Sequence, residues 1–161
     1  MRKTLLAIAT IVALGTLLSA RNAQKVGINV DSFAPNITVT DNDSTWKLSD
    51  LRGNFVLLNF WASNNAESRI RNIEYNKAID NFENVQFASI NYDRSKAIYE
   101  EIIRLDNVNK DSQFYDEGGT NSEVYKQFHL EKDLNSYLLN QDGQIVAVNP
   151  DMQELTKILC Q

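Results

Sequence analysis

The sequence predicts a single α/β domain, with a central mixed β-sheet and helices on both faces of the sheet. Three observations support this fold class. The run at 55–61, FVLLNFW, is nearly all apolar, as expected for a central strand buried on both faces. Strand-like and helix-like segments then alternate along the chain. Two late strand-like segments are joined by Gln141-Asp142-Gly143, which is typical of a hairpin.

The N-terminus has the pattern of a secretory signal. Residues 2–3 are positively charged, residues 5–18 form an uncharged apolar run, and Ser19-Ala20 supplies small residues for cleavage. We therefore expect a signal peptide over 1–20 and a single domain over 21–161. The alternative is a retained membrane anchor, although the run is short for a full span.

Charge and cysteine content narrow the location and the partners. Leu18-Ser19-Ala20 resembles the start of a bacterial lipobox, but Arg21 stands in place of the lipid-bearing cysteine. This favours a soluble periplasmic or secreted product with no membrane span after cleavage. The net charge of −5 and the lack of a Lys/Arg cluster argue against a nucleic-acid partner. Cys160 is the only cysteine, so an internal disulfide is excluded and a dimer bridged through this thiol is left open.

The first half is expected to contain a strand pair, the central strand and a long helix. Residues 33–40 have strand character, and the turn cluster at 41–44 leads to a partner strand at 46–48. After a tight connection and the central strand, a helix is predicted over 66–82. Its apolar residues recur at near-helical spacing: Ile70, Ile73, Ile79 and Phe82.

The second half is expected to add four more strands and three helices around the core. In chain order these are a core strand at 85–92, a helix at 94–105 capped by Asp93, a polar loop at 106–119 with a short strand at 113–115, a short helix at 122–128, hairpin strands at 136–140 and 144–149, and a terminal helix from 150 to 159.

Several blocks of the sequence carry a resemblance to a known family. The most specific is LSDLRGNFVLLNFWAS at 48–63, and it is accompanied by FAPNITVT at 33–40, INYD at 90–93 and the hairpin YLLN and DGQIV within 137–146. In this order they resemble the thioredoxin superfamily, in particular the TlpA/ResA and redoxin (AhpC/TSA-like) branch of bacterial envelope proteins. The resemblance implies a thioredoxin-like fold and, for an intact member, thiol–disulfide exchange.

Two parts of the family's active site, the cysteine pair and the cis-proline, are altered in this chain. The resemblance implies a Cys-x-x-Cys just after the Trp-Ala segment, where Asn65 and Ser68 stand here. Neither side chain can take part in two-electron sulfur chemistry. The resemblance also implies a cis-proline before the late strand, and Leu134 occupies that place. A cis bond before a residue other than proline costs about 2.5–4 kcal/mol, so we expect a trans bond there.

We therefore expect a redox-inactive thioredoxin-like module that uses no cofactor and no metal. It would bind a peptide or an unidentified envelope protein in the groove between the Asn65 turn and the Leu134 loop. The candidate groove residues are Trp61, Asn64, Asn65, Glu67 and Leu134. One alternative is a divergent thiol–disulfide oxidoreductase or antioxidant protein in which Cys160 reacts with an external thiol. A second is a purely structural subunit of an envelope assembly.

The remaining polar residues are expected to have structural roles. Asn64 and Glu67 have the spacing of a capping box at the start of a helix. His129 is the only histidine and has no cysteine or second histidine with which to share a metal, so it is expected to be packed or on the surface. Cys160 is expected to be buried or a harmless terminal thiol. Three acidic residues without an Asp-x-Asp-type loop are expected to be solvated caps: Asp93, Asp116 and Glu117.

Overall fold

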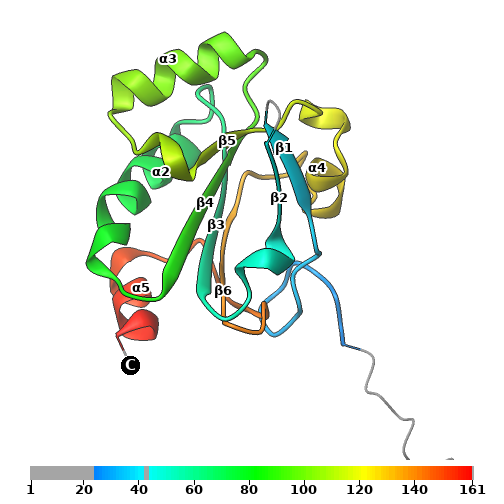
Figure 1. Cartoon of the computed structure of the whole chain (residues 1–161), viewed down its shortest axis with the longest axis vertical. Coiled ribbons are helices and arrows are strands. Elements are labelled where there is room, and N and C mark those ends of the chain that lie inside the picture. Colours follow the sequence, from blue (N-terminus) through cyan, green and yellow to red (C-terminus); the bar gives the residue numbers. More distant parts are fainter. Residues whose placement is uncertain (1–23, 42–43, 161) are drawn as a thin grey trace, which may run out of the picture.

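A five-stranded mixed sheet forms the centre of the molecule (Figure 1). The computed structural model describes residues 24–41 and 44–160. The strands of the sheet are β3 (Phe55–Trp61), β4 (Val85–Asn91), β5 (Gln113–Tyr115), β6 (Ser136–Leu139) and β7 (Ile145–Val148). Their order is β5-β4-β3-β6-β7, with β4 parallel and β6 antiparallel to β3. The predicted mixed sheet is confirmed. The predicted signal peptide lies outside the described residues.

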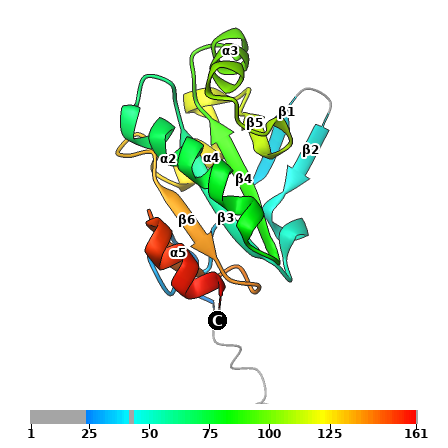
Figure 2. The same cartoon turned by 90° about the vertical axis from the view of Figure 1, so that its left-hand side faces the viewer.

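Helices pack on one face of the sheet, and a hairpin and a short helix pack on the other. The helices are α2 (Ala66–Ala78), α3 (Lys96–Asp106), α4 (Glu123–Gln127) and α5 (Met152–Leu159), and the hairpin strands are β1 (Thr38–Asp41) and β2 (Ser44–Lys47). Figure 2 shows α2 and α5 on the same face. Within the described residues, no helix has the length and apolar character needed to cross a bilayer.

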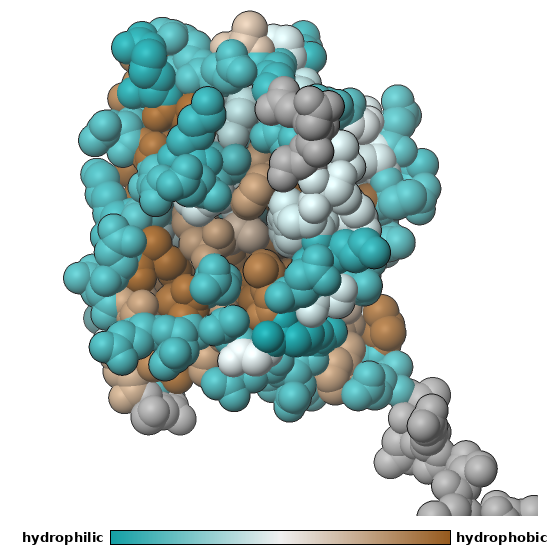
Figure 3. Space-filling model, in the orientation of Figure 1, coloured by the Kyte–Doolittle hydropathy of each residue, from teal (hydrophilic) through white to brown (hydrophobic). Residues whose placement is uncertain are grey.

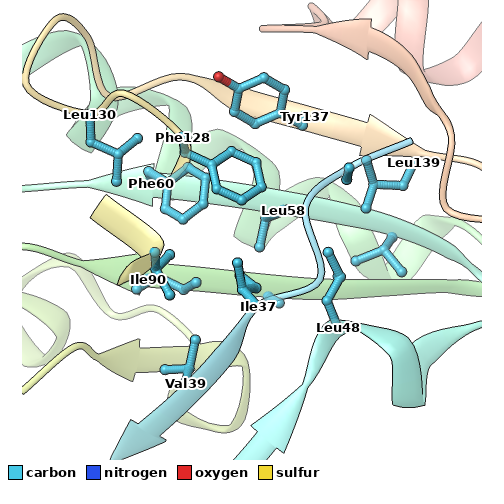
Figure 4. Close-up of a cluster of buried hydrophobic side chains, with 14 of the residues drawn as sticks. Ile37, Val39, Leu48, Leu58, Phe60, Ile90, Phe128, Leu130, Tyr137 and Leu139 are labelled. Atoms are coloured by element: carbon cyan, nitrogen blue, oxygen red, sulfur yellow. The ribbon is translucent and has the colours of Figure 1, made fainter. Parts of the chain in front are cut away.

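The central strand β3 is buried on both faces, as its sequence predicts. Leu58 and Phe60 point into a core beneath the hairpin and α4, together with Ile37, Phe128 and other side chains (Figure 4). Leu57 points the opposite way, into a second cluster with side chains of α2 and α5. Alternate residues of one strand therefore supply both hydrophobic layers. The end of β3, and the residues that follow it, are therefore held between two packed hydrophobic layers.

The β4 side of the sheet is only partly covered. β5 pairs with β4 over Ser89–Asn91 alone, which leaves the first half of β4 at an edge of the sheet. In Figure 3, apolar surface is visible in the middle of this face, with hydrophilic side chains around it. Gln86, an exposed polar residue in this half, breaks the apolar run, as expected for an edge strand that avoids pairing with another chain.

The expected strand at 33–40 is shorter than predicted. Only Thr38–Asp41 forms a ladder, and it pairs with β2 in the expected antiparallel manner. Phe33 makes isolated bridges instead. Pro35 lacks an N–H group for a ladder, and Asn36 accepts a hydrogen bond from the Ser49 N–H through its side chain (3.0 Å). Residues 33–37 are therefore held by loop contacts.

The inward face of α2 is polar, which contradicts the predicted apolar face. Ser68, Asn72 and Asn76 form one row along the helix and are buried against the sheet, whereas Ile70 is 55% exposed. The helix also ends at Ala78 and is followed by a short 3₁₀ turn, so the predicted end at residue 82 is wrong. The polar row is accommodated because the sheet presents polar partners beneath it.

Those partners form a hydrogen-bond network between α2 and four strands, β3, β4, β5 and β6. Asn59 donates to Ser89 Oγ (2.8 Å) and accepts from Ser136 Oγ (2.7 Å). Ser89 Oγ donates to Asn72 Oδ1 (2.6 Å). The amides of Asn72 and Gln113 donate to each other's oxygens (3.1 and 3.2 Å). All five residues are buried, so their hydrogen bonds replace water that cannot reach them.

The second half matches the prediction except at the start of α3. Ser95 caps this helix, with its hydroxyl accepting from the Ile98 N–H (3.4 Å), and Asp93 does not. The short strand at 113–115, the short helix capped by Ser122, and the hairpin are all present at the expected places. Asp151 caps α5, the expected terminal helix.

Candidate functional site

The start of α2 is closed by hydrogen bonds between the two residues at the expected redox positions. The Asn65 Oδ1 accepts the Ser68 N–H (2.9 Å), and the Ser68 Oγ donates to the Asn65 carbonyl (3.1 Å). The same hydroxyl accepts from the Ala62 N–H (3.4 Å), and Ser68 is fully buried. Both side chains therefore stabilise the helix terminus, where an N-cap contributes about 1 kcal/mol.

The predicted capping box at Asn64 and Glu67 is wrong by one residue. Asn65 occupies the N-cap position, and Asn64 is exposed ahead of it. Glu67 therefore lies in the first turn at a position that cannot reach back to the cap. Its carboxylate instead accepts from the Arg71 Nη1 (2.5 Å), one turn further along α2. The carboxylate also lies near the N-terminus of α2, where negative charge is favourable.

Arg71 ties α2 to the Leu134 loop. Its Nη2 donates to the Leu134 carbonyl (2.6 Å), and the arginine is largely buried. No peptide bond of the described residues is cis, so the bond before Leu134 is trans, as the sequence predicts. The loop therefore keeps its position through a charged hydrogen bond to a backbone carbonyl.

A groove of about 390 Å³ lies between the Asn65 turn and the Leu134 loop. Asn64, Asn65 and Leu134 line it, as the sequence predicts. Trp61 does not, because it is fully buried against Tyr99 and Ile103. Glu67 lies outside the groove, in a neighbouring hollow. The structure therefore brings three of the five predicted residues together in this groove.

Sequence reasoning missed several lining residues: Tyr92, Arg94, Tyr125 and Lys132. One signal could have found the first two. Parallel strands end at the same edge of a sheet, so the residues after β4 must lie beside those after β3. Arg94 and Lys132 are both exposed and lie on different loops, and the structure records no ion pair for either within the described residues.

Two buried carboxylates hold the groove loops, which corrects the expectation that they are solvated caps. Asp93 Oδ1 accepts from the N–H and the hydroxyl of Ser63 (2.8 and 2.7 Å), which joins the loop after β4 to the loop after β3. Asp116 Oδ2 accepts from the Tyr92 hydroxyl (2.8 Å). Burial, and then the nearby Asp116 carboxylate, raise the pKa of the Tyr92 phenol, so it stays a hydrogen-bond donor. The groove is preformed.

The sequence profile of the AhpC/TSA family matches residues 30–148. The chain belongs to the AhpC/TSA family. A thioredoxin-like protein from Parabacteroides distasonis is 32% identical with a TM-score of 0.74, and the match covers 85% of this chain and 98% of that one. A thiol-disulfide oxidoreductase from Bacteroides fragilis is 26% identical with a TM-score of 0.66, covering 80% and 98%. No curated protein matches this chain.

In this AhpC/TSA-family chain the single cysteine lies far from the groove. Cys160 is exposed, which excludes the buried alternative and leaves a terminal thiol. The preceding residue, Leu159, packs against the same hydrophobic cluster as Phe55 and Val85, where β3 and β4 begin. Asn65 follows the other end of β3, about 20 Å away along a seven-residue strand. Figures 1 and 2 both place the C-terminus at the end of the molecule remote from the start of α2.

The structure gives no sign of a metal centre at this family member's groove. Within the described residues there is no group of three or more His, Cys, Asp or Glu side chains that could hold a metal ion. His129 is exposed, with its Nδ1 3.5 Å from Glu131 Oε1, so its expected surface position is confirmed. Neither residue approaches the geometry of a zinc site.

Proposed function

We propose that this protein is a redox-inactive, thioredoxin-like binding module of the bacterial envelope, and that its groove receives an extended segment of a partner. The observation that carries the proposal is the hydrogen bonding of Asn65 and Ser68. An internal dithiol site needs two sulfur atoms that interconvert between thiols and a disulfide, and an amide and a hydroxyl at these positions cannot form a disulfide. Here both are used to cap α2.

The groove supports the binding part of the proposal. Its walls come from loops that are already fixed by Asp93, Asp116 and Arg71, so a partner would meet a preformed surface. Its volume, about 390 Å³, is in the range of a site for a few residues of a peptide or a small molecule. Its lining carries two cations, Arg94 and Lys132, and two carboxylates, Glu131 and Asp133, which offer hydrogen-bond donors and acceptors to the backbone of an extended segment.

The alternative function is a divergent thiol–disulfide oxidoreductase or antioxidant protein. The name of the Bacteroides fragilis relative favours it. In this chain such chemistry would depend on Cys160 and an external thiol, because no second cysteine is present. The distance between Cys160 and the groove argues against it, since the thiol would act without any of the preformed surface.

A site-specific cross-linking experiment tests the binding function. A photoreactive amino acid replaces Lys132 on the groove rim, and in a matched control it replaces Lys77, which is exposed at the far end of α2. After irradiation of the producing bacterium, we expect a discrete cross-linked species from position 132 and none from position 77. Equal products from both positions, or none from either, would contradict a groove-binding role.

A further inference from the structure

A second hollow lies beside the groove, between α2 and the connection from β7 to α5. Its volume is about 470 Å³. Ile70, Pro150 and Met152 give it an apolar lining, and Ile70 is 55% exposed although isoleucine is ordinarily a buried residue. Arg71 lines this hollow and Leu134 lines the groove. The hydrogen bond between them therefore marks the boundary of the two sites.

The walls of the hollow are fixed by hydrogen bonds. The Tyr75 hydroxyl donates to the Pro150 carbonyl (2.9 Å), which fastens the connection before α5 to α2. Asn149 Oδ1 accepts from the Ser136 N–H (2.7 Å), and Asp151 Oδ1 accepts from the Glu154 N–H (2.8 Å). The hollow keeps its shape without an occupant, so docking requires little ordering of the chain.

The rim of the hollow is acidic. Glu67, Glu74 and Asp151 are exposed carboxylates around it. Arg71 is the one cation among the lining residues, and its Nη1 and Nη2 are used by Glu67 and by the Leu134 carbonyl. The structure records no ion pair for Glu74 or Asp151 within the described part of the chain.

We propose that this hollow docks a partner segment in which one large apolar side chain is flanked by lysine or arginine. The apolar side chain covers Ile70 and Met152, and the flanking cations meet Glu74 and Asp151, because the Glu67 carboxylate already accepts from Arg71. Charge complementarity selects this occupant. An acidic segment would be repelled by the rim. A second copy of this chain carries the same net charge of −5 and would be repelled as a whole. The proposal does not depend on what the groove binds.

The test uses a synthetic peptide with leucine at its centre and two lysines on each side, acetylated and amidated. It is titrated into the isotopically labelled mature chain, and the amide signals are followed by NMR. We expect shifts centred on Ile70, Glu74 and Met152, and binding that weakens about fivefold between roughly 50 and 300 mM NaCl. A peptide with glutamate in place of lysine, or serine in place of leucine, is expected to give no shifts there. Equal binding of these peptides would overturn the proposal.

Variants separate the rim charges from the general charge of the protein. Glu74→Gln combined with Asp151→Asn removes two rim charges, and asparagine remains a good cap for α5. We expect this pair to weaken binding about fivefold. The matched control is Asp80→Asn combined with Glu83→Gln, which removes two exposed charges beyond the end of α2 and is expected to leave binding unchanged. Equal loss in both pairs would overturn the proposal.

The same titration distinguishes this site from the groove. Lys132→Ala alters the groove rim and leaves every lining residue of the hollow in place. We expect it to leave the shifts at Ile70 and Met152 unchanged. If peptide binding is lost in this variant, the peptide occupies the groove and the proposed second site is wrong, while the groove-binding function stands.

Discussion

Replacing Asn65 and Ser68 with cysteine is expected to give this chain a working redox pair. The two positions are separated by one helical turn, so their Cα atoms lie within the range that a disulfide spans. The helix N-terminus favours a thiolate there. In the Cys160→Ser background, we expect the double variant to form an internal disulfide in a glutathione buffer. We also expect it to reduce insulin at least about tenfold faster than the chain with Asn65 and Ser68.

Single variants control this experiment. Asn65→Cys alone and Ser68→Cys alone each supply one thiol and are expected to form only mixed disulfides with glutathione. Loss of the Asn65 cap is expected to cost about 1 kcal/mol, which is too little to unfold the helix. Circular dichroism of each variant checks that the helix is still formed. A folded double variant that carries both thiols and forms no internal disulfide would contradict the geometry described for the start of α2.

Asn72→Leu is expected to destabilise the fold by about 3 kcal/mol or more. The side chain of Asn72 contacts Ser89 and Gln113 by hydrogen bonds of 2.6–3.2 Å, and all three residues are buried. Leucine has a similar size but leaves the Ser89 hydroxyl without its acceptor and the Gln113 amide without its partner, at about 1–3 kcal/mol for each buried group. Urea unfolding followed by circular dichroism measures the difference.

Two comparisons make this result specific. Glu74→Gln on the exposed side of the same helix is expected to change stability by less than about 0.5 kcal/mol. Adding Gln113→Met to Asn72→Leu removes the amide that Asn72→Leu leaves without a hydrogen-bond partner. We expect this double variant to recover part of the lost stability, because replacing both members of a pair with apolar groups is less costly than replacing one. A loss below about 1 kcal/mol for Asn72→Leu would show that the network contributes little.

The elements that were predicted correctly are those whose local sequence pattern agrees with their environment in the fold, such as an apolar strand in the core. The apolar run at 55–61 is typical of a strand buried on both faces. The Asp142-Gly143 turn indicates the hairpin whose two strands, β6 and β7, it joins. The inward face of α2 could not be predicted in this way. Its buried Asn72 is compatible with the core only because Gln113 and Ser89 lie on strands that the sequence does not place beside it.

The site was predicted in part for the same reason. The resemblance placed Asn65 and Leu134 on either side of one groove, and the structure does so too. Arg71 donates to the Leu134 carbonyl, a buried contact that the sequence does not suggest because arginine is usually exposed. Asp93 was taken for a cap because it precedes a helix, whereas its carboxylate joins two loops through Ser63. Such contacts depend on tertiary structure that local patterns do not contain.

The central claim is that this fold carries no thiol–disulfide chemistry of its own. The most direct measurement is the rate of insulin reduction, driven by dithiothreitol, with the chain over residues 21–161 and with its Cys160→Ser variant. We predict that both rates equal the rate with dithiothreitol alone. A rate comparable to that of a dithiol thioredoxin in the native chain, whether or not it survives the loss of Cys160, would contradict the account.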